Sequence, residues 1–387
     1  MSQKGRLYFD NAATSFPKPQ EVYEAMDRYA REHGGSAGRS AHAQAVAGSR
    51  LLFDLRLSLA ELFGGNEDRV VLTKNATESV NLALFSLLHE GAVVVHSPLE
   101  HNAVMRPLQF LAKTRGIKLI DAPDDFHGRM TPKALESVVG KYSVDAVVTL
   151  HASNVHGLAH DIAAFGEICR RREILFVVDA AQTGGCMPVD MINMNIDALC
   201  LTGHKGLLGP TGIGALLLSD RAAEKIMPLI YGGTGSESGK EQMPDFLPDR
   251  LEAGTHNTFG ASGLLAGLQY LSQRTVADVM KYENELRRHM IDRLRFIVGV
   301  TIFGDDIGPA TGVLGFTCPL SPSDMAYLLD SQYGISVRAG LHCAPRAHKT
   351  LGTFPQGAVR LAPGPFTPIE AVDEVADAIS DILRTKS

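Results

Sequence analysis

The sequence feature that most constrains the fold is a repeated alternation of strand-like and helix-like patterns between residues 70 and 179. Parallel strands need a long crossover connection, usually a helix, so this alternation predicts a mostly parallel sheet covered by helices on both faces. Functional side chains are then expected at the carboxyl ends of the strands. The expected strands are 70–73, 92–96, 117–121, 145–150 and 174–179, and the expected helices are 101–114, 132–139 and 162–171.

The pattern changes after about Thr258, which predicts a second domain. A chain of 387 residues is too long for one ordinary compact domain. We expect a large α/β domain over residues 17–257 and a small α+β domain over residues 258–387, joined by residues 1–16. The small domain is expected to contain a helical region to 297 with a break near 274–275, strands near 299–303, 313–317, 337 and 359, and helices over 324–332 and 368–383.

Charge and cysteine content argue against several classes of protein. The net charge of −6 and the lack of a basic stretch with interleaved aromatic residues give no support to a nucleic-acid partner. No run of about 18 apolar residues exists, so no membrane span is expected, and the N-terminus shows no secretory signal. The five cysteines have no metal-like CxxC spacing, so we expect no metal and a reducing cytoplasm.

An acid and a lysine after two apolar runs point to the chemistry. The run 176–179 ends in Asp179, and the run 198–201 precedes the glycine-flanked Lys205. The 26 residues between them (205 − 179) leave room for two strands and their connection. Each residue alone has a plainer explanation, since strand-end Asp residues often cap turns and most lysines are surface charges. Together they suit pyridoxal phosphate, which needs a lysine to hold its aldehyde as a Schiff base and an acid to keep its ring nitrogen protonated.

The segments VVDAAQ around Asp179 and LTGHKGLLGP around Lys205 resemble the cofactor strand and the lysine segment of class V, fold type I pyridoxal-phosphate enzymes, in particular the cysteine desulfurases. The resemblance extends from YFDNAATSFPKP near the N-terminus to VRLAPGPF near the C-terminus. It implies the fold type I architecture, with the cofactor in the large domain and a catalytic cysteine in the small one. It also implies a homodimer that acts on L-cysteine.

Further residues are candidates for holding the cofactor phosphate. Ala76 and Thr77 lie between a strand and a helix, where free N–H groups bind phosphate, although a plain helix cap explains Thr77 by itself. Thr202 and His204 are expected to donate to the same phosphate. The resemblance adds Thr255, which the partner subunit of a dimer would contribute.

Three polar residues after strands are candidates for contacts with the cofactor ring and the substrate. The resemblance implies that His101 stacks on the pyridine ring and helps to move protons, which suits an imidazole, while a helix cap is the plainer alternative. Asn154 can reach a ring oxygen or a substrate carboxylate, and Gln182, three residues after the acid, can reach the ring hydroxyl. His151 and His156 are expected to be structural.

Arg360 and Arg338 are candidates for binding the substrate. Arg360 stands in an otherwise apolar run, where an unpaired guanidinium is costly. A substrate α-carboxylate is a suitable bidentate partner, and an ion pair with an acid of the chain is the alternative. Arg338 ranks second, because it can also hold the local geometry or pair with an acid.

Cys343 is the candidate nucleophile. It lies in the segment RAGLHCAP, where positive neighbours are expected to lower the pKa of its thiol. The segment resembles the active-cysteine segment of the second subgroup of cysteine desulfurases, although Leu341 stands where that subgroup often has histidine. The other cysteines lie in apolar or helical surroundings typical of core residues, namely Cys169, Cys186, Cys200 and Cys318.

These features lead us to expect a cysteine desulfurase that produces alanine and a persulfide on Cys343. The resemblance implies a sulfur-acceptor protein of iron–sulfur cluster assembly or thio-cofactor synthesis. Selenocysteine lyase and a class V aminotransferase or epimerase are the alternatives within the family. A nucleotide-binding oxidoreductase is disfavoured, because the glycines of 232–235 open no helix. A scaffold without activity would be colourless when purified.

Overall fold

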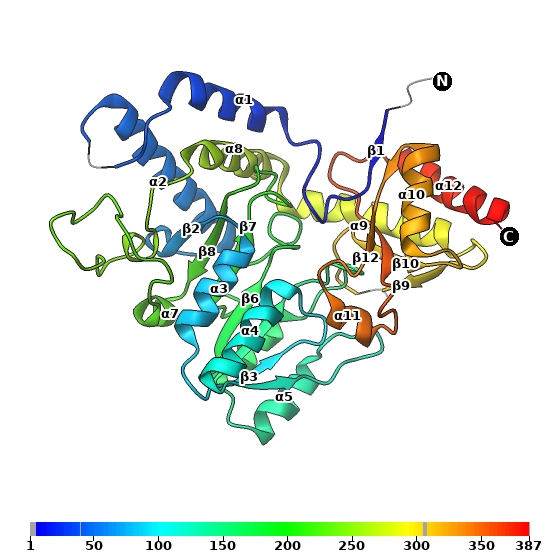
Figure 1. Ribbon diagram of the computed structural model, residues 1–387, viewed down its shortest axis with the longest axis horizontal. Coiled ribbons are helices and arrows are strands. Elements are labelled where there is room, and N and C mark those ends of the chain that lie inside the picture. Colours follow the sequence, from blue (N-terminus) through cyan, green and yellow to red (C-terminus); the bar gives the residue numbers. More distant parts are fainter. Residues whose placement is uncertain (1–4, 39, 305–307, 387) are drawn as a thin grey trace.

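The computed structural model describes residues 5–38, 40–304 and 308–386. Its large sheet has seven strands in the order β2 (Val70–Thr73), β8 (Gly214–Leu218), β7 (Ala198–Thr202), β6 (Leu175–Asp179), β5 (Ala146–Leu150), β3 (Val93–His96) and β4 (Lys118–Asp121) (Figure 1). The five strands β7, β6, β5, β3 and β4 run parallel to one another, whereas β8 is antiparallel to both of its neighbours, β2 and β7. The predicted α/β fold with a mostly parallel sheet is confirmed. β8 is the exception because no helical crossover separates it from β7.

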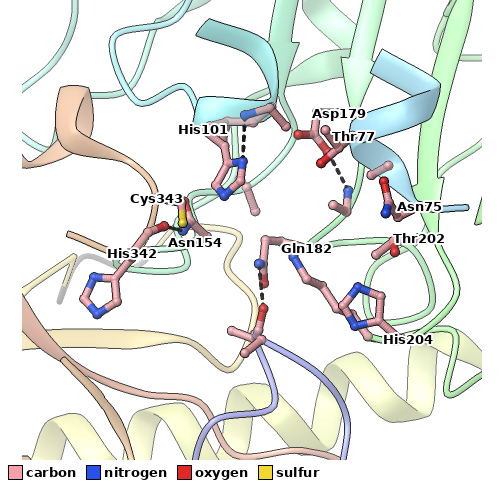
Figure 2. Close-up of a pocket in the computed structure, with 18 of the residues that line it drawn as sticks. Asn75, Thr77, His101, Asn154, Asp179, Gln182, Thr202, His204, His342 and Cys343 are labelled. Atoms are coloured by element: carbon pink, nitrogen blue, oxygen red, sulfur yellow. Dashed lines mark hydrogen bonds between the residues drawn. The ribbon is translucent and has the colours of Figure 1, made fainter. Parts of the chain in front are cut away.

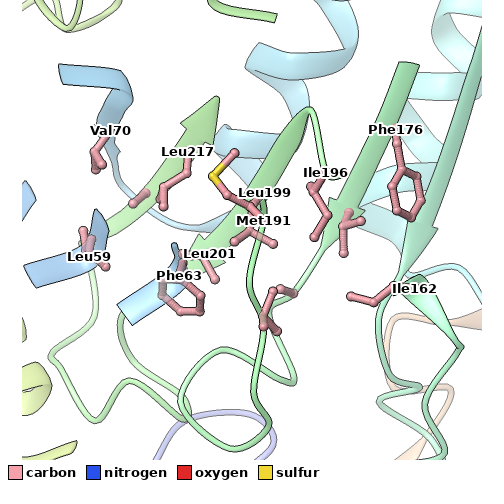
Figure 3. Packing of buried hydrophobic residues seen from close by; sticks show 14 of the residues in the cluster. Leu59, Phe63, Val70, Ile162, Phe176, Met191, Ile196, Leu199, Leu201 and Leu217 are labelled. Carbon is pink, nitrogen blue, oxygen red and sulfur yellow. The ribbon is translucent and has the colours of Figure 1, made fainter. Parts of the chain in front are cut away.

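Helices cover both faces of this sheet. α3 (Ala76–Leu87), α4 (Asn102–Arg115) and α7 (Asp220–Lys225) pack on one face, and α2 (Ala43–Phe63), α5 (Pro132–Lys141), α6 (Ile162–Arg171) and α8 (Thr258–Arg274) pack on the other, with α1 (Gln20–Arg28) against α8. Each face has its own hydrophobic core. Phe176 and Leu199 belong to the core beneath α2, α5, α6 and α8 (Figure 3), whereas the adjacent Val177 and Ala198 belong to the core beneath α3, α4 and α7. Burial on both faces explains the continuous apolar runs of the strands. No helix in the described ranges has the length and apolar character needed to cross a membrane.

A second, antiparallel sheet has the strand order β12 (Arg338–Gly340), β13 (Ala358–Leu361), β10 (Leu314–Thr317) and β9 (Thr301–Phe303). α9 (Val276–Leu294), α10 (Pro322–Tyr333) and α12 (Glu370–Lys386) pack with it around a core that includes Phe316. β1 (Leu7–Tyr8) pairs in parallel with β11 (Ile335–Ser336), so the N-terminal residues lie beside this sheet (Figure 1). The expected break between the two long helices occurs at Thr275, whose φ is 63°.

The parallel strands of the large sheet end at one edge, where segments distant in the sequence meet. α11 (Pro345–Thr350) packs against this edge, since Ala344 and Ala347 form an apolar cluster with Leu99 and Leu150. Leu150 ends β5, and Leu99 lies in the turn that follows β3. The segment that contains Cys343 therefore lies against the strand ends that carry the other predicted site residues.

Gly166 of α6 and Gly140 of α5 provide a matched test of this packing. A methyl group at residue 166 would overlap the carbonyl oxygen of Met194, whereas one at residue 140 meets nothing within 4 Å. We expect Gly166→Ala to destabilise the protein by roughly 1–3 kcal/mol through overpacking. Gly140→Ala is expected to stabilise it by up to about 1 kcal/mol, because alanine favours a helix. Denaturant titration followed by circular dichroism measures both, and equal effects would contradict the close approach of residues 166 and 194.

Candidate active site

A cavity of about 350 Å³ lies at this edge and is bounded by the N-terminal residues Ala12 and Ala13 on one side. Figure 2 shows many of its polar side chains directed towards a shared space. All of the predicted site residues except Thr255 line it, namely Ala76, Thr77, His101, Asn154, Asp179, Gln182, Thr202, His204, Lys205, Arg338, Cys343 and Arg360. His151 and His156 are buried and are not part of its lining.

Two adjacent parallel strands bring Asp179 and Lys205 to this cavity. Asp179 is the last residue of β6, and Lys205 lies three residues after β7. Burial lowers the pKa of Lys205 to about 8, and the nearby Asp179 opposes this effect. Burial also raises the pKa of Asp179, against the effects of Lys205 and of the Ala181 N–H, which donates to Oδ1 at 2.9 Å. An amine with a pKa near 8 is partly unprotonated at neutral pH and can react with an aldehyde.

The start of α3 supplies hydrogen-bond donors to one end of the cavity. Asn75 caps this helix, since its Oδ1 accepts the N–H of Glu78 at 3.1 Å. The cap explanation given for Thr77 is therefore wrong, and Asn75 is a cavity residue that the sequence analysis missed. Oγ1 of Thr202 and Nδ1 of His204 are buried and have no hydrogen-bond partner among the described residues. Unpaired groups of this kind, beside a helix N-terminus, suit a bound anion.

His101, Gln182 and Asn154 surround the middle of the cavity (Figure 2). Nδ1 of His101 accepts the N–H of Ala103 at 3.0 Å, so the histidine caps α4 as well as facing the cavity. Burial, helped by Lys205 and other cations, lowers the pKa of His101 to about 4 and leaves the ring neutral at neutral pH. Nε2 of Gln182 donates to the carbonyl oxygen of Ala12 at 3.1 Å. Oδ1 of Asn154 is buried without a partner in the described chain.

Asp10 joins the two predicted arginines and is the main residue that the sequence analysis missed. Its Oδ1 lies 2.8 Å from Nη2 of Arg360, and both of its oxygens accept the Nε–H of Arg338, at 3.1 and 3.0 Å. Nη1 of Arg360 donates to the carbonyl oxygen of Asn154 at 3.0 Å, and Nε has no partner within the described ranges. The ion pair considered as an alternative is present. One carboxylate faces two guanidinium groups, so this cluster keeps one positive charge that a substrate carboxylate can balance.

Cys343 lies at the cavity on the turn that follows β12, and its side chain is exposed. Cys318 is partly exposed, and the remaining three cysteines are buried. His342, which precedes the thiol, is not one of the positive neighbours that the sequence analysis expected. Burial lowers the pKa of His342 to about 3, so this ring is neutral at neutral pH. The positive charge of Arg338 is likewise paired, with Asp10.

Thr255 lies outside the cavity of its own chain. It lines a separate hollow of about 150 Å³, together with Lys74 and Glu78 at the start of α3. The resemblance implies that Thr255 contributes to the cavity of a partner subunit.

Comparisons with known proteins agree with this geometry. The family model for aminotransferase class-V matches residues 7–375. The chain is similar to a probable cysteine desulfurase of Pyrococcus abyssi, with 32% identity over 98% of this chain and 94% of the relative. It is also similar to the apo structure of a cysteine desulfurase from Thermococcus onnurineus NA1, with a TM-score of 0.91 and 31% identity over 98% of this chain and 95% of the other. A cysteine desulfurase structure from Escherichia coli, in the S-sulfonic acid form, gives a TM-score of 0.87 and 27% identity over 99% and 96% of the two chains.

The lowered pKa of Lys205 can be tested in protein from which any cofactor has been removed. We expect the ¹³C resonance of reductively methylated Lys205 to titrate near pH 8, because burial disfavours its charged form. Lys18 is expected to titrate near pH 8 as well, because burial also lowers its pKa. The resonance that is missing in Lys205→Ala is therefore assigned to Lys205. Asp179→Asn is expected to lower the midpoint of Lys205 further, since it removes a negative charge, and to leave that of Lys18 in place. A Lys205 midpoint unchanged in Asp179→Asn would contradict the described interaction.

Proposed function

The chain belongs to the class-V aminotransferase family, and on this premise we propose that it is a cysteine desulfurase, which converts L-cysteine to L-alanine and takes up the sulfur on Cys343. Relatives and solved structures that match nearly the whole chain carry that name. The observation that carries the proposal is an exposed thiol, Cys343, in the same cavity as the partly buried Lys205, whose amine has a lowered pKa. An aminotransferase or an epimerase needs the amine but not the thiol.

The residues of the cavity fit pyridoxal phosphate, which the enzymes of this family use as cofactor. The unpaired Thr202 Oγ1 and His204 Nδ1, with the N–H groups of the first turn of α3, would hold its phosphate. Asp179 would bind the ring nitrogen, and Lys205 would bind the aldehyde carbon. When bound, the cofactor accepts the electron pair that is released at the α-carbon of the substrate.

The substrate carboxylate would bind to Arg360 without displacing Asp10. Nε of Arg360 is free among the described groups, and each terminal nitrogen uses only one of its two N–H groups in the contacts with Asp10 and Asn154. Arg338 would contribute the second positive charge of the cluster. The amine of Lys205, with its lowered pKa, is suited to take the α-proton, and the neutral ring of His101 can relay a proton beside it.

Cys343 would carry out the sulfur transfer. Its thiolate attacks the sulfur of the substrate, and an S–S bond forms as the Cβ–S bond of the substrate breaks. The electron pair stays on Cβ, which then takes up a proton and becomes the methyl group of alanine. The sulfur remains on Cys343 as a persulfide. Because this side chain is exposed, a thiol of a sulfur-acceptor protein can reach it.

We further propose a homodimer in which Thr255 of each subunit completes the phosphate site of the other. The segment that leads to Thr255 exposes a group of large apolar side chains, namely Met227, Leu229, Ile230, Tyr231 and Phe246. Exposed apolar surface of this kind marks a protein interface.

We propose a large and a small domain, with residues 1–16 in the small one, but the expected boundary between 257 and 258 moves to the end of α8, because α8 packs on the large sheet. The pairing of β1 with β11 and the ion pairs of Asp10 support the assignment of the N-terminal residues to the small domain. All five cysteines are free thiols, which supports a reducing compartment such as the cytoplasm.

Removal of the thiol is the direct test of the proposed function. We expect Cys343→Ala to reduce alanine formation from L-cysteine by about 10³-fold or more, because it removes the nucleophile. The visible absorbance of the bound cofactor is expected to persist, and Cys318→Ala, which changes a partly buried thiol elsewhere, is the matched control. Wild-type turnover of L-cysteine by Cys343→Ala would disprove the mechanism. Activity retained on selenocysteine alone would favour a selenocysteine lyase.

Mixed dimers test the role of Thr255. We expect Lys205→Ala and Thr255→Val each to lower activity when made alone. If Thr255 acts on the partner, each site combines Lys205 of one subunit with Thr255 of the other. A mixed dimer of the Lys205→Ala and Thr255→Val subunits would then contain one site with both changes and one site with neither. Coexpression with two affinity tags and purification of the mixed species should therefore restore activity. Absence of restoration would show that Thr255 does not act across the interface.

A further inference from the structure

Cys343 lies on a strained turn. His342 and Cys343 have φ values of 50° and 54°, in the left-handed region that favours glycine. Other residues adopt this conformation at a cost on the order of 1–3 kcal/mol each, and only where their surroundings impose it. Two hydrogen bonds from residues at the edge of the large sheet help to hold His342 and Cys343 in this conformation. The N–H of Asn102 donates to the carbonyl oxygen of Cys343 at 2.8 Å, and Nδ2 of Asn154 donates to that of His342 at 2.7 Å.

A second set of contacts holds the same turn through side chains. Nδ1 of His342 lies 3.2 Å from Nε2 of His348, and Nδ1 of His348 lies 2.7 Å from Oγ1 of Thr353. Nε2 of His342 lies 3.4 Å from the carbonyl oxygen of Arg338. His348 is fully buried, and His342 is 7% exposed. Figure 2 shows the ring of His342 pointing away from His101 and the other labelled side chains.

One arrangement of protons satisfies every contact in this set. The hydroxyl of Thr353 donates to Nδ1 of His348, Nε2–H of His348 donates to Nδ1 of His342, and Nε2–H of His342 donates to the carbonyl oxygen of Arg338. Both rings are neutral in this arrangement. Burial favours that state, because it lowers the pKa of His342 to about 3 and that of His348 to about 4. The three hydrogen bonds therefore run in one direction, from Thr353 to Arg338.

We propose that His348 is a positioning residue for Cys343, which acts through His342 to hold the turn in the conformation that presents the thiol to the cavity. This inference rests on the proposed function, because it assumes that Cys343 is the nucleophile. His348 belongs to α11, whose Ala347 packs in the cluster with Leu99 and Leu150. His348, which we call the anchor of the turn, thus belongs to a helix that packs in an apolar cluster.

The geometry explains why the anchor would affect the sulfur step selectively. A return of residue 342 or 343 to negative φ would redirect the Cα–Cβ bond of Cys343 and move its sulfur. A misplacement of about 1 Å in reacting groups can lower a rate on the order of 10²-fold. Substrate binding at Arg360 and proton removal at Lys205 use other elements, β13 and the segment after β7. Loss of the anchor is therefore expected to lower kcat and to leave KM unchanged.

Two substitutions of His348 form a matched test in the cofactor-loaded enzyme. His348→Gln keeps a side-chain N–H that can donate to His342, whereas His348→Leu fills similar space without a donor. We expect His348→Leu to lower kcat for alanine formation from L-cysteine by about 10- to 100-fold at unchanged KM, and His348→Gln to retain most of it. Equal loss in both variants, or full activity in His348→Leu, would overturn the proposal.

A second pair of variants covers the case in which His348→Leu does not fold. Thr353→Val removes the hydroxyl that donates to His348, and Thr353→Ser keeps it. We expect the valine variant to lose kcat and the serine variant to retain it, and equal activity of the two would overturn the proposal.

A spectroscopic measurement separates this proposal from the proposed function. In protein with ¹⁵N-labelled histidine, the signals of His342 and His348 should both show the Nε2–H tautomer, and they should not titrate between pH 6 and 8, because burial lowers both pKa values. Their assignment comes from the spectra of His348→Gln. Wild-type protein that forms no alanine would disprove the proposed function and leave this result intact. A different tautomer of either ring would overturn the inferred hydrogen-bond chain, whatever the activity.

Discussion

The placement of two opposite charges, a buried Asp179 and a partly buried Lys205, at the ends of adjacent parallel strands is the constraint on which the site depends. Asp179 and Lys205 reach one cavity because β6 and β7 run side by side in the same direction. Burial disfavours the charged form of each side chain, which is a cost to folding. The same burial brings the pKa of the lysine to about 8, and so provides a reactive amine. The helices on both faces of the sheet bury the strands that lead to this edge.

In the proposed function, substrate recognition depends on a second charge cluster, in which Asp10 and Arg360 are buried and Arg338 is exposed. Asp10 follows β1, Arg338 begins β12 and Arg360 lies in β13. The parallel pairing of β1 with β11 brings Asp10 between the two arginines. Without Asp10, two guanidinium groups would face each other in a site where Arg360 is 2% exposed. With it, the cluster keeps a single positive charge, which suits one carboxylate better than a neutral or a dianionic group.

Local patterns in the sequence were sufficient for much of this fold and site. Continuous apolar runs predicted the parallel strands, and polar residues at their ends, such as Asp179, predicted the edge where the cavity lies. What depends on long-range contacts or on burial could not be predicted in this way. The pairing of Asp10 with arginines more than 300 residues away has no local signal. The neutral state of His342 follows from its burial, which the polar segment around it did not suggest. Asn75 rather than Thr77 caps α3, a choice between neighbouring residues that depends on backbone conformation.

The two reactive groups are held in different ways, and their tasks explain the difference. Lys205 follows a central strand of the sheet, so its position relative to Asp179 is set by main-chain pairing that does not change during a reaction. In the proposed reaction, Cys343 would reach the substrate and later an acceptor outside, and its exposed position on a turn suits this task. A strained turn can provide such a position only if neighbouring groups fix it. Two of those groups, the N–H of Asn102 and the amide of Asn154, belong to segments that also line the cavity or adjoin a residue that does. These contacts therefore tie the position of the thiol to the wall of the cavity, whereas Arg360 and Lys205 are positioned by β13 and by the segment after β7.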